Sequence, residues 1–261
     1  MVRSRVWALF LVVFVVSGCK PPPPAPEALE DLCAYLFEHM ADEDDEALEE
    51  GLVNLENWLV DGLEKTQDGY NIENLSLDAI ESTGETGDNT ALVGASVASV
   101  SKHELDRQIQ ALVIDDQAAI FGDNYVVFDR SYETDESCFP GRDCLHLEGT
   151  SYTESSWAGL LDVVSESTVE FRWVETPSGW MMIQRSYLNH PAEINWESVE
   201  VNAQYFLAVV LPCKGSSVRL QAMWIDAEYG VLPVGEDFAL NQLVQSLQDA
   251  SGMLETWMDE N

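Results

Sequence analysis

A β-hairpin is the clearest structural signal in this chain, and it lies in residues 169–188, which read VEFRWVETPSGWMMIQRSYL. Apolar and charged side chains alternate before the Thr-Pro-Ser-Gly turn, as they do in a strand with two different faces. The tight turn then places Glu170 opposite Arg185. In the same register Trp173 lies opposite Met182. Opposite charges on one face and large apolar groups on the other both stabilise a pair of strands.

A second hairpin and a final helix follow this first hairpin. Residues 199–211 and 218–226 alternate in the same way, with Tyr205 and Trp224 each on the apolar face of its strand. Residues 237–258 carry apolar side chains at helical spacing. Such a helix docks on the sheet, because otherwise its apolar stripe would be exposed to water.

The residues before the first hairpin predict further helices and strands. Residues 27–40 and 46–65 each have a helical apolar stripe, which predicts an N-terminal helical hairpin. Residues 92–100 and 118–132 have the composition of strands. Ser101 and Glu104 have the spacing of a capping box, which predicts a helix from Ser101 to about residue 113. His103 then lies in the first turn as an exposed side chain.

The predicted fold class is α+β, with an N-terminal helical hairpin, an antiparallel β-meander and a long C-terminal helix that covers it. Residues 27–261 form one domain, in which residues 27–66 are the helical hairpin and residues 90–261 are the sheet and its helices. From residue 92 onward this order of elements resembles the helix-grip fold of START-like lipid-transfer domains. The resemblance implies an apolar tunnel between the sheet and the last helix, and it assigns no functional residue.

The first 20 residues have the pattern of a secretory signal. Arg3 and Arg5 precede an apolar run over residues 6–16, which at eleven residues is too short to span a bilayer. The run ends in Val16-Ser17-Gly18-Cys19, which resembles the lipobox of bacterial lipoproteins. The resemblance implies removal of residues 1–18, lipid attachment at Cys19 and a lipid-anchored protein of the bacterial cell envelope.

Two features after the lipobox refine this prediction. In the lipoprotein family an Asp after the lipidated Cys often retains the protein at the inner membrane, and here that position is Lys20. The outer membrane is therefore the expected location. Residues 19–26 contain five prolines and form the expected tether, which as a polyproline II segment raises the domain by roughly 20 Å.

The charge of the chain excludes some partners. Loss of Arg3 and Arg5 leaves 10 of the 12 Lys and Arg against 47 Asp and Glu. Such a chain does not bind nucleic acid and does not lie on an anionic membrane surface. The acidic run at residues 42–46 lacks the glycine turn of a calcium loop, so we interpret it as a solvated helix start.

Four cysteines remain after Cys19, and an exported protein is in an oxidising compartment. Cys138 and Cys144 flank a Pro-Gly turn, which predicts a disulfide between them. Cys33 and Cys213 are then left to form a second one. The alternative is a buried thiol at Cys33 and a free surface thiol at Cys213.

The sequence contains no motif for catalysis, a metal or a cofactor, and its four histidines have no ligand spacing. We therefore expect a binding module that is not an enzyme. Its ligand is expected to be a hydrophobic or amphipathic small molecule in a cavity lined by Trp173, Met182, Tyr205 and Trp224. The alternative, which is favoured for each of these side chains taken singly, is that they fill a solid core. The alternative is an envelope assembly protein that binds a protein partner through its acidic surface.

Overall fold

The computed structural model describes residues 23–85, 88–122, 125–157, 161–196, 198–230 and 238–261. The strands of this part are β1 (Tyr70–Asn71), β2 (Val93–Ser101), β3 (Val127–Tyr132), β4 (His146–Trp157), β5 (Leu161–Thr176), β6 (Gly179–Leu188), β7 (Glu193–Ile194), β8 (Glu200–Cys213) and β9 (Ser216–Glu228). They form one antiparallel sheet in the order β1-β2-β9-β8-β6-β5-β4-β3, and β7 pairs with β5.

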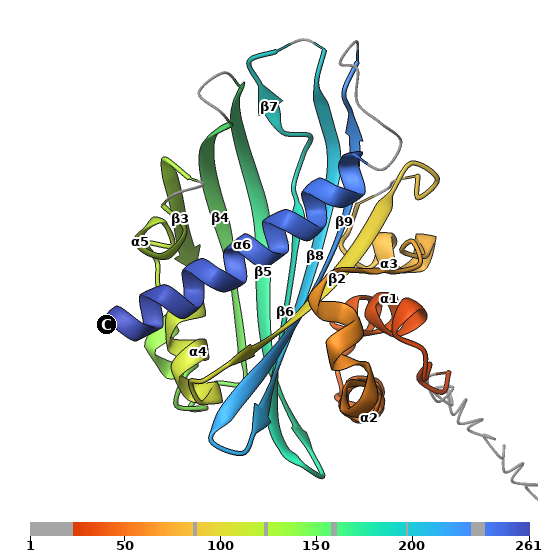
Figure 1. Cartoon of the computed structure of the whole chain (residues 1–261), viewed down its shortest axis with the longest axis vertical. Helices are drawn as coiled ribbons and strands as arrows, with labels where there is room; N and C mark the ends of the chain where they lie inside the picture. The colour runs from red at the N-terminus through yellow and green to blue at the C-terminus, as the bar shows by residue number, and fades with distance from the viewer. Residues whose placement is uncertain (1–22, 86–87, 123–124, 158–160, 197, 231–237) are drawn as a thin grey trace, which may run out of the picture.

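Helices cover both faces of this sheet. They are α1 (Leu29–His39), α2 (Glu46–Gln67), α3 (Leu77–Glu81), α4 (Leu105–Leu112), α5 (Ala118–Phe121) and α6 (Phe238–Glu260), with one 3-10 turn, η1 (Glu136–Cys138). Figure 1 shows α6 crossing one face of the curved sheet beside α4 and α5, with α1, α2 and α3 together at the other side. The predicted α+β class, with its N-terminal helices and long C-terminal helix, is confirmed.

The register of the first hairpin is as the sequence predicts. In the β5–β6 pair Glu170 lies opposite Arg185 and Trp173 lies opposite Met182. Arg185 donates from Nε and Nη2 to the Glu170 carboxylate at 2.9 and 3.0 Å. The charged pair does not face water, however, because Arg185 is 3% exposed beneath the N-terminal helices.

Each face of the sheet has its own apolar core. On one face the buried side chains of α1, α2 and α3 pack against alternate residues of the central strands, including Leu207 and Trp224. On the opposite face a second core joins Phe171, Trp173 and Met182 to Leu254 and to further residues of α4, α5 and α6. Because side chains alternate along a strand, neighbouring residues of one strand belong to different cores.

The helix near residue 101 begins later than predicted. Ser101 is the last residue of β2, and its hydroxyl donates to Glu255 of α6 at 2.6 Å. Helix α4 starts at Leu105, and its N-cap residue Glu104 makes no side-chain capping bond. The capping-box prediction is wrong, because Ser101 continues the ladder with Ser217 instead.

Two other elements differ from the prediction. Residues 118–121 form the short helix α5 rather than a strand, and only β3 follows as extended chain. β4 and the first half of β5 were not predicted at all, because their runs of Ser, Thr and Glu lack apolar alternation. These polar strands are the ones that border the cavity described below.

The proposed signal, lipobox and lipid attachment at Cys19 lie outside the described residues. The end of the predicted tether lies inside them and is docked on the domain. Tyr35 donates its hydroxyl to the carbonyl of Pro23, and Asn54 donates to the carbonyls of Ala25 and Pro26. The segment from Pro23 is therefore part of the domain and not a free spacer. Within the described ranges no helix combines the length and the apolar composition needed to cross a bilayer.

Candidate functional site

A cavity of about 680 Å³ lies between α6 and the face of the sheet that α6 crosses. Its walls come from six strands, β3, β4, β5, β6, β8 and β9, together with α4, α5 and α6. Below it, towards the β5–β6 turn, the same face is closed by the core that contains Trp173 and Met182. The cavity is thus the unfilled part of one layer of the domain.

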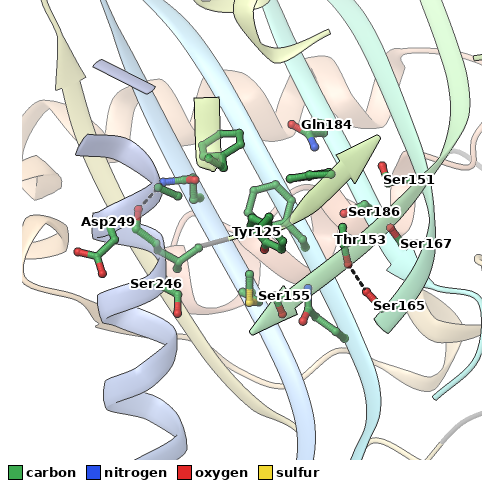
Figure 2. A pocket seen from close by; sticks show the side chains of 18 of the residues that line it. Tyr125, Ser151, Thr153, Ser155, Ser165, Ser167, Gln184, Ser186, Ser246 and Asp249 are labelled. Atoms are coloured by element: carbon green, nitrogen blue, oxygen red, sulfur yellow. Dashed lines mark hydrogen bonds between the residues drawn. The ribbon is translucent and has the colours of Figure 1, made fainter. Parts of the chain in front are cut away.

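Hydroxyl and amide side chains form the sheet side of the cavity. They are Ser151, Thr153, Ser155 and Ser156 on β4, Ser165 and Ser167 on β5, Gln184 and Ser186 on β6, Gln204 on β8 and Gln221 on β9. Figure 2 shows the hydroxyls of β4, β5 and β6 across from Ser246 and Asp249 of α6. Thr153 and Ser165 share a hydrogen bond of 2.7 Å. Most of these hydroxyl and amide residues recur at every second position of their strand, so their side chains share one face of the sheet.

Aromatic and aliphatic side chains form the rest of the lining. At one edge Phe121 and Tyr125 pack around Phe128, with ring centroids 6.0 and 4.8 Å from that of Phe128. Further along the sheet Phe206 and Met223 face the same space. The cavity is therefore amphipathic, with an apolar side and a hydrogen-bonding side.

α6 is held over the cavity by polar contacts. Gln221 of β9 donates from Nε2 to the carbonyl of Leu247 at 3.2 Å and to the hydroxyl of Ser251 at 2.7 Å. Gln221 is 1% exposed, so these bonds satisfy a buried amide. They fix the distance between helix and sheet beside the empty space.

Three charged side chains are part of the described lining: Arg130, Arg219 and Asp249. Burial, and then the charge of Arg130, lower the pKa of Arg219 from the ordinary value of an arginine to about 9. Burial also raises the pKa of Tyr125, which keeps its phenol neutral. The described lining contains no histidine, cysteine, lysine or glutamate, so none of its serines has an imidazole or amine as base.

The four residues predicted to line a ligand cavity do not line this one. Tyr205 and Trp224 face α1 in the opposite layer, each with its ring centroid 5.8 Å from that of Phe37. Trp173 and Met182 lie on the side of α6 but are fully buried in the closed core below the cavity. The prediction is wrong because large apolar side chains fill the layers, whereas the hollow forms where the strands carry small polar ones.

The sequence does contain a pattern that marks the residues lining the cavity, but it is a pattern of hydroxyl side chains and not of apolar ones. Ser151, Thr153 and Ser155 follow one another at alternate positions, and so do Ser165 and Ser167 on the paired strand. A hydroxyl at every second residue on neighbouring strands indicates one polar face. Whether such a face meets water or a covered cavity depends on the position of α6.

One of the two predicted disulfides is confirmed. Cys138 and Cys144 are bonded, and the turn between them places the Phe139 carbonyl to accept from Trp173 Nε1 at 2.8 Å. Cys33 and Cys213 are both free, which corrects the second prediction. Cys33 is fully buried among the apolar residues of α1 and α2, whereas Cys213 is exposed at the end of β8. Burial raises the pKa of the Cys33 thiol.

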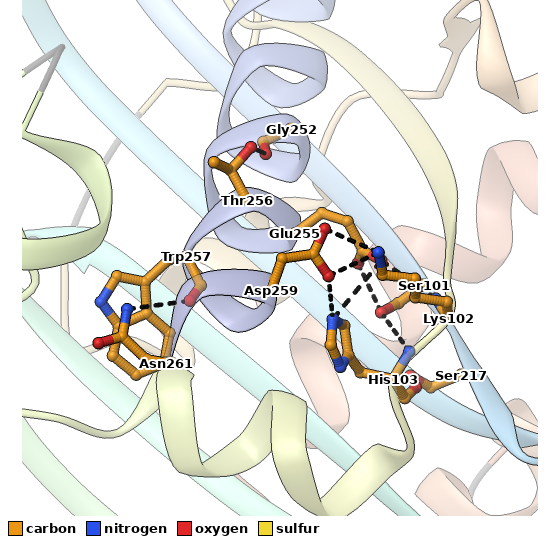
Figure 3. Close-up of polar contacts among 10 residues, drawn as sticks. All are labelled: Ser101, Lys102, His103, Ser217, Gly252, Glu255, Thr256, Trp257, Asp259 and Asn261. Carbon is orange, nitrogen blue, oxygen red and sulfur yellow. Dashed lines mark hydrogen bonds and ion pairs between the residues drawn. The ribbon is translucent and has the colours of Figure 1, made fainter.

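A polar cluster at the other end of α6 has the composition of a metal site. Ligand atoms of His103, Glu255 and Asp259 all lie within 4.8 Å of one another (Figure 3). Asp259 already pairs with Lys102 Nζ at 2.6 Å and with His103 Nε2 at 2.9 Å. Glu255 accepts from the Ser101 hydroxyl. Because cations near a helix C-terminus are stabilising, we interpret the cluster as a set of ion pairs and hydrogen bonds that attaches the C-terminal end of α6 to the β2–α4 connection.

Comparison with known proteins gives similarity of fold only. No protein-family model and no curated protein matches the chain. A STAR-related lipid transfer protein from Xanthomonas axonopodis is 11% identical with a TM-score of 0.45, covering 67% of this chain and 97% of that one. The human StarD13 lipid transfer and protein localization domain is 11% identical with a TM-score of 0.44, covering 78% and 95%. At such identities and TM-scores no ligand or activity carries over.

Proposed function

We propose that this chain is a lipid-anchored binding module of the bacterial cell envelope that holds an amphipathic small molecule. The observation that supports binding is the cavity under α6, whose volume of about 680 Å³ is in the range of small-molecule sites. Its aromatic edge suits an apolar portion of a ligand. Its serine and glutamine side chains suit a portion that accepts and donates hydrogen bonds.

The same lining supports a role in binding rather than catalysis. The described lining offers its hydroxyls no histidine, cysteine or lysine as a general base, and its charged groups are two guanidinium groups and the exposed carboxylate of Asp249. The guanidinium groups can orient and neutralise a ligand, and among the described residues no hydrogen bond joins the Asp249 carboxylate to a lining hydroxyl that it could activate. We therefore propose a non-catalytic module.

The anchor remains part of the proposal on the strength of the lipobox. With Cys19 lipidated, three residues lie between it and Pro23, which is bonded to α1, so the two are four residue steps apart. At about 3.1 Å per residue the spacer is roughly 12 Å long. The domain would then sit close to the membrane, with α1 and α2 nearest the anchor and the cavity on the opposite face of the sheet.

Filling the cavity tests the binding function. Ser167 and Ser186 face the cavity from neighbouring strands, so the double variant Ser167→Leu/Ser186→Leu should fill the hollow and abolish binding of dodecanol and of dodecanoate. Ser178→Leu, in the exposed β5–β6 turn, makes the same chemical change away from the cavity and should bind like the wild type. Isothermal titration calorimetry of the mature chain measures both.

Two results would count against a small-molecule module. One is a wild-type protein that binds neither amphiphile, and that purifies without any bound small molecule by native mass spectrometry. The other is a filled variant that folds and binds as well as the wild type. Either would favour the alternative, an assembly protein that uses its acidic surface.

Processing tests the anchor separately. Cys19→Ala should accumulate as an unprocessed precursor that incorporates no labelled fatty acid, because the thiol is the acceptor. Cys213→Ala is the matched control, since that thiol is exposed and lies outside the lipobox. A mature, acylated Cys19→Ala protein would contradict the lipoprotein proposal.

A further inference from the structure

Arg219 is a buried cation without a partner on two of its nitrogens. It is 4% exposed, and its Nε and Nη1 have no hydrogen-bond partner among the described residues. Removing a guanidinium from water is costly unless an anion and hydrogen bonds compensate. An anionic group that accepts hydrogen bonds from these nitrogens would stabilise a buried arginine in this state.

The position of Arg219 is at the deep end of the cavity. Its neighbour across the ladder is Val210 of β8, which in turn pairs with Met182 of β6. Val210 and Met182 belong to the closed core, whereas the next cavity-facing residue of β9, Gln221, lines the open part with Arg219. Arg219 thus lies where the filled layer ends and the hollow begins.

A second guanidinium, that of Arg130, lines the same cavity. Arg130 of β3 donates from Nε to Ser151 at 3.2 Å and from Nη1 to the carbonyl of Leu112. Its guanidinium carbon lies 5.2 Å from the ring centroid of Phe128 and 5.5 Å from that of Phe171. Neutral groups therefore fix Arg130 in place, and none of them is an anion.

Elsewhere in the protein buried arginines have carboxylate partners. Arg172 pairs with Asp45 at 2.6 Å and Arg185 pairs with Glu170 at 2.7 Å. Neither Arg130 nor Arg219 forms an ion pair with any residue that the structure describes. In a chain with 47 acidic residues, two uncompensated guanidinium groups that face one cavity are not explained by a shortage of anions.

We infer that Arg219 and Arg130 bind the anionic head group of the ligand, and that the ligand is a single-chain amphiphile ending in a carboxylate or phosphate. A guanidinium matches either group through paired N–H donors. The chain then lies along the Phe128 and Phe206 side of the cavity. This inference rests on the proposed function.

Three ligands with one chain length test the inference: dodecanoate, dodecyl phosphate and dodecanol. Calorimetry of the wild type should show at least about tenfold tighter binding of one or both anions than of dodecanol, which is what one charge-assisted hydrogen bond contributes. The stronger anion identifies the head group. Acetate and inorganic phosphate, which lack the chain, should bind far more weakly.

Substitution of Arg219 tests its role. Arg219→Met should remove the preference for the anions and keep the affinity for dodecanol, and Arg219→Lys should restore part of the preference. Arg142→Met is the control, because it removes an arginine that pairs with Asp106 outside the cavity. The thermal midpoint of Arg219→Met without ligand should equal or exceed that of the wild type, since a buried unpaired charge is lost.

The outcomes separate the inference from the proposed function. Equal binding of dodecanol and both anions leaves the binding module standing and overturns the inference. An Arg219→Met protein that keeps the preference, or that loses stability and binds as before, also overturns it and makes Arg219 a structural residue. Binding of none of the three amphiphiles overturns the proposed function and the inference together.

Discussion

The two faces of the sheet are packed differently. On the face of α1, α2 and α3 large apolar side chains fill the layer, and the buried cations Arg172 and Arg185 each have a carboxylate. On the face of α6 the layer is filled at one end only. Its other part is a cavity in which Arg130 and Arg219 have no acidic partner among the described residues.

The filled face and the hollow face of the sheet therefore contribute differently to stability and to binding. Three helices cover one face, and they can be packed to the density of a protein interior. On the opposite face α4 and α5 lie towards one edge and the long helix α6 crosses the curved sheet (Figure 1), so the middle strands are left with space beneath α6. The filled face supplies the free energy of folding, and the hollow face carries a destabilising charge that a ligand can neutralise.

The largest effect is expected from substituting two adjacent residues of β9, one on each face of the sheet. Trp224 is fully buried on the filled face and donates from Nε1 to the Glu73 carbonyl, whereas Met223 faces the cavity. Trp224→Ala should lower the free energy of unfolding by about 4 kcal/mol, and Met223→Ala by about 1 kcal/mol. Urea denaturation measures both. Similar losses at the two positions would show that the faces are packed alike.

Breaking one ion pair on the filled face should have the next largest effect. Glu170→Gln keeps the shape of the side chain but leaves Arg185 buried without its anion. The expected loss is about 3 kcal/mol of unfolding free energy, which is the cost of an uncompensated buried charge. Arg219→Met, measured by the same urea denaturation, should not lower the free energy of unfolding. Equal losses in the two variants would mean that Arg219 has a partner after all.

The pH dependence of binding gives the smallest effect. Burial, followed by the charge of Arg130, lowers the pKa of free Arg219 to about 9. The charged form is therefore penalised in the folded protein below about pH 9, and this penalty is relieved as the pH rises from about 9 towards the ordinary pKa of arginine, so stability rises with pH in this window. A bound anion favours the charged form, so its affinity should fall as the pH rises through about 9.

Titrations at pH 7.5 and pH 10 measure this change. The preference for dodecanoate over dodecanol should shrink several-fold in the wild type and stay constant in Arg219→Met. The other groups that face Arg219 across the cavity are Arg130 on β3, Tyr125 before β3 and Asp249 on α6. A pH dependence that persists in Arg219→Met would assign the titration to one of them.

The sequence predicted local pairings well because they depend on neighbours along the chain. The alternation in residues 169–188 determined which residues of β5 and β6 lie opposite each other. The Pro-Gly turn between Cys138 and Cys144 made their bond predictable. The helical stripes gave α1, α2 and α6, since each stripe must be buried somewhere.

The assignment of side chains to a cavity failed for a physical reason. A large apolar side chain is not a sign of a binding site here. Trp173 and Tyr205 each pack tightly among other apolar residues, in different cores, and leave no space for a ligand. Similarly, Cys33 was paired with Cys213 by counting, although one thiol is in the core and the other is at a hairpin end.

The sequence alone was sufficient to predict the two faces of the hairpin strands, the register of the first hairpin, the short disulfide and the acidic, lysine-poor composition. Only the tertiary structure decided which face each layer of helices covers. That choice turns the hydroxyls of Ser151 and Ser167 from apparent surface groups into a cavity wall, and it leaves Arg219 buried without an anion. The physical reason is that periodicity separates two faces of a strand, whereas coverage depends on contacts between segments far apart in the chain.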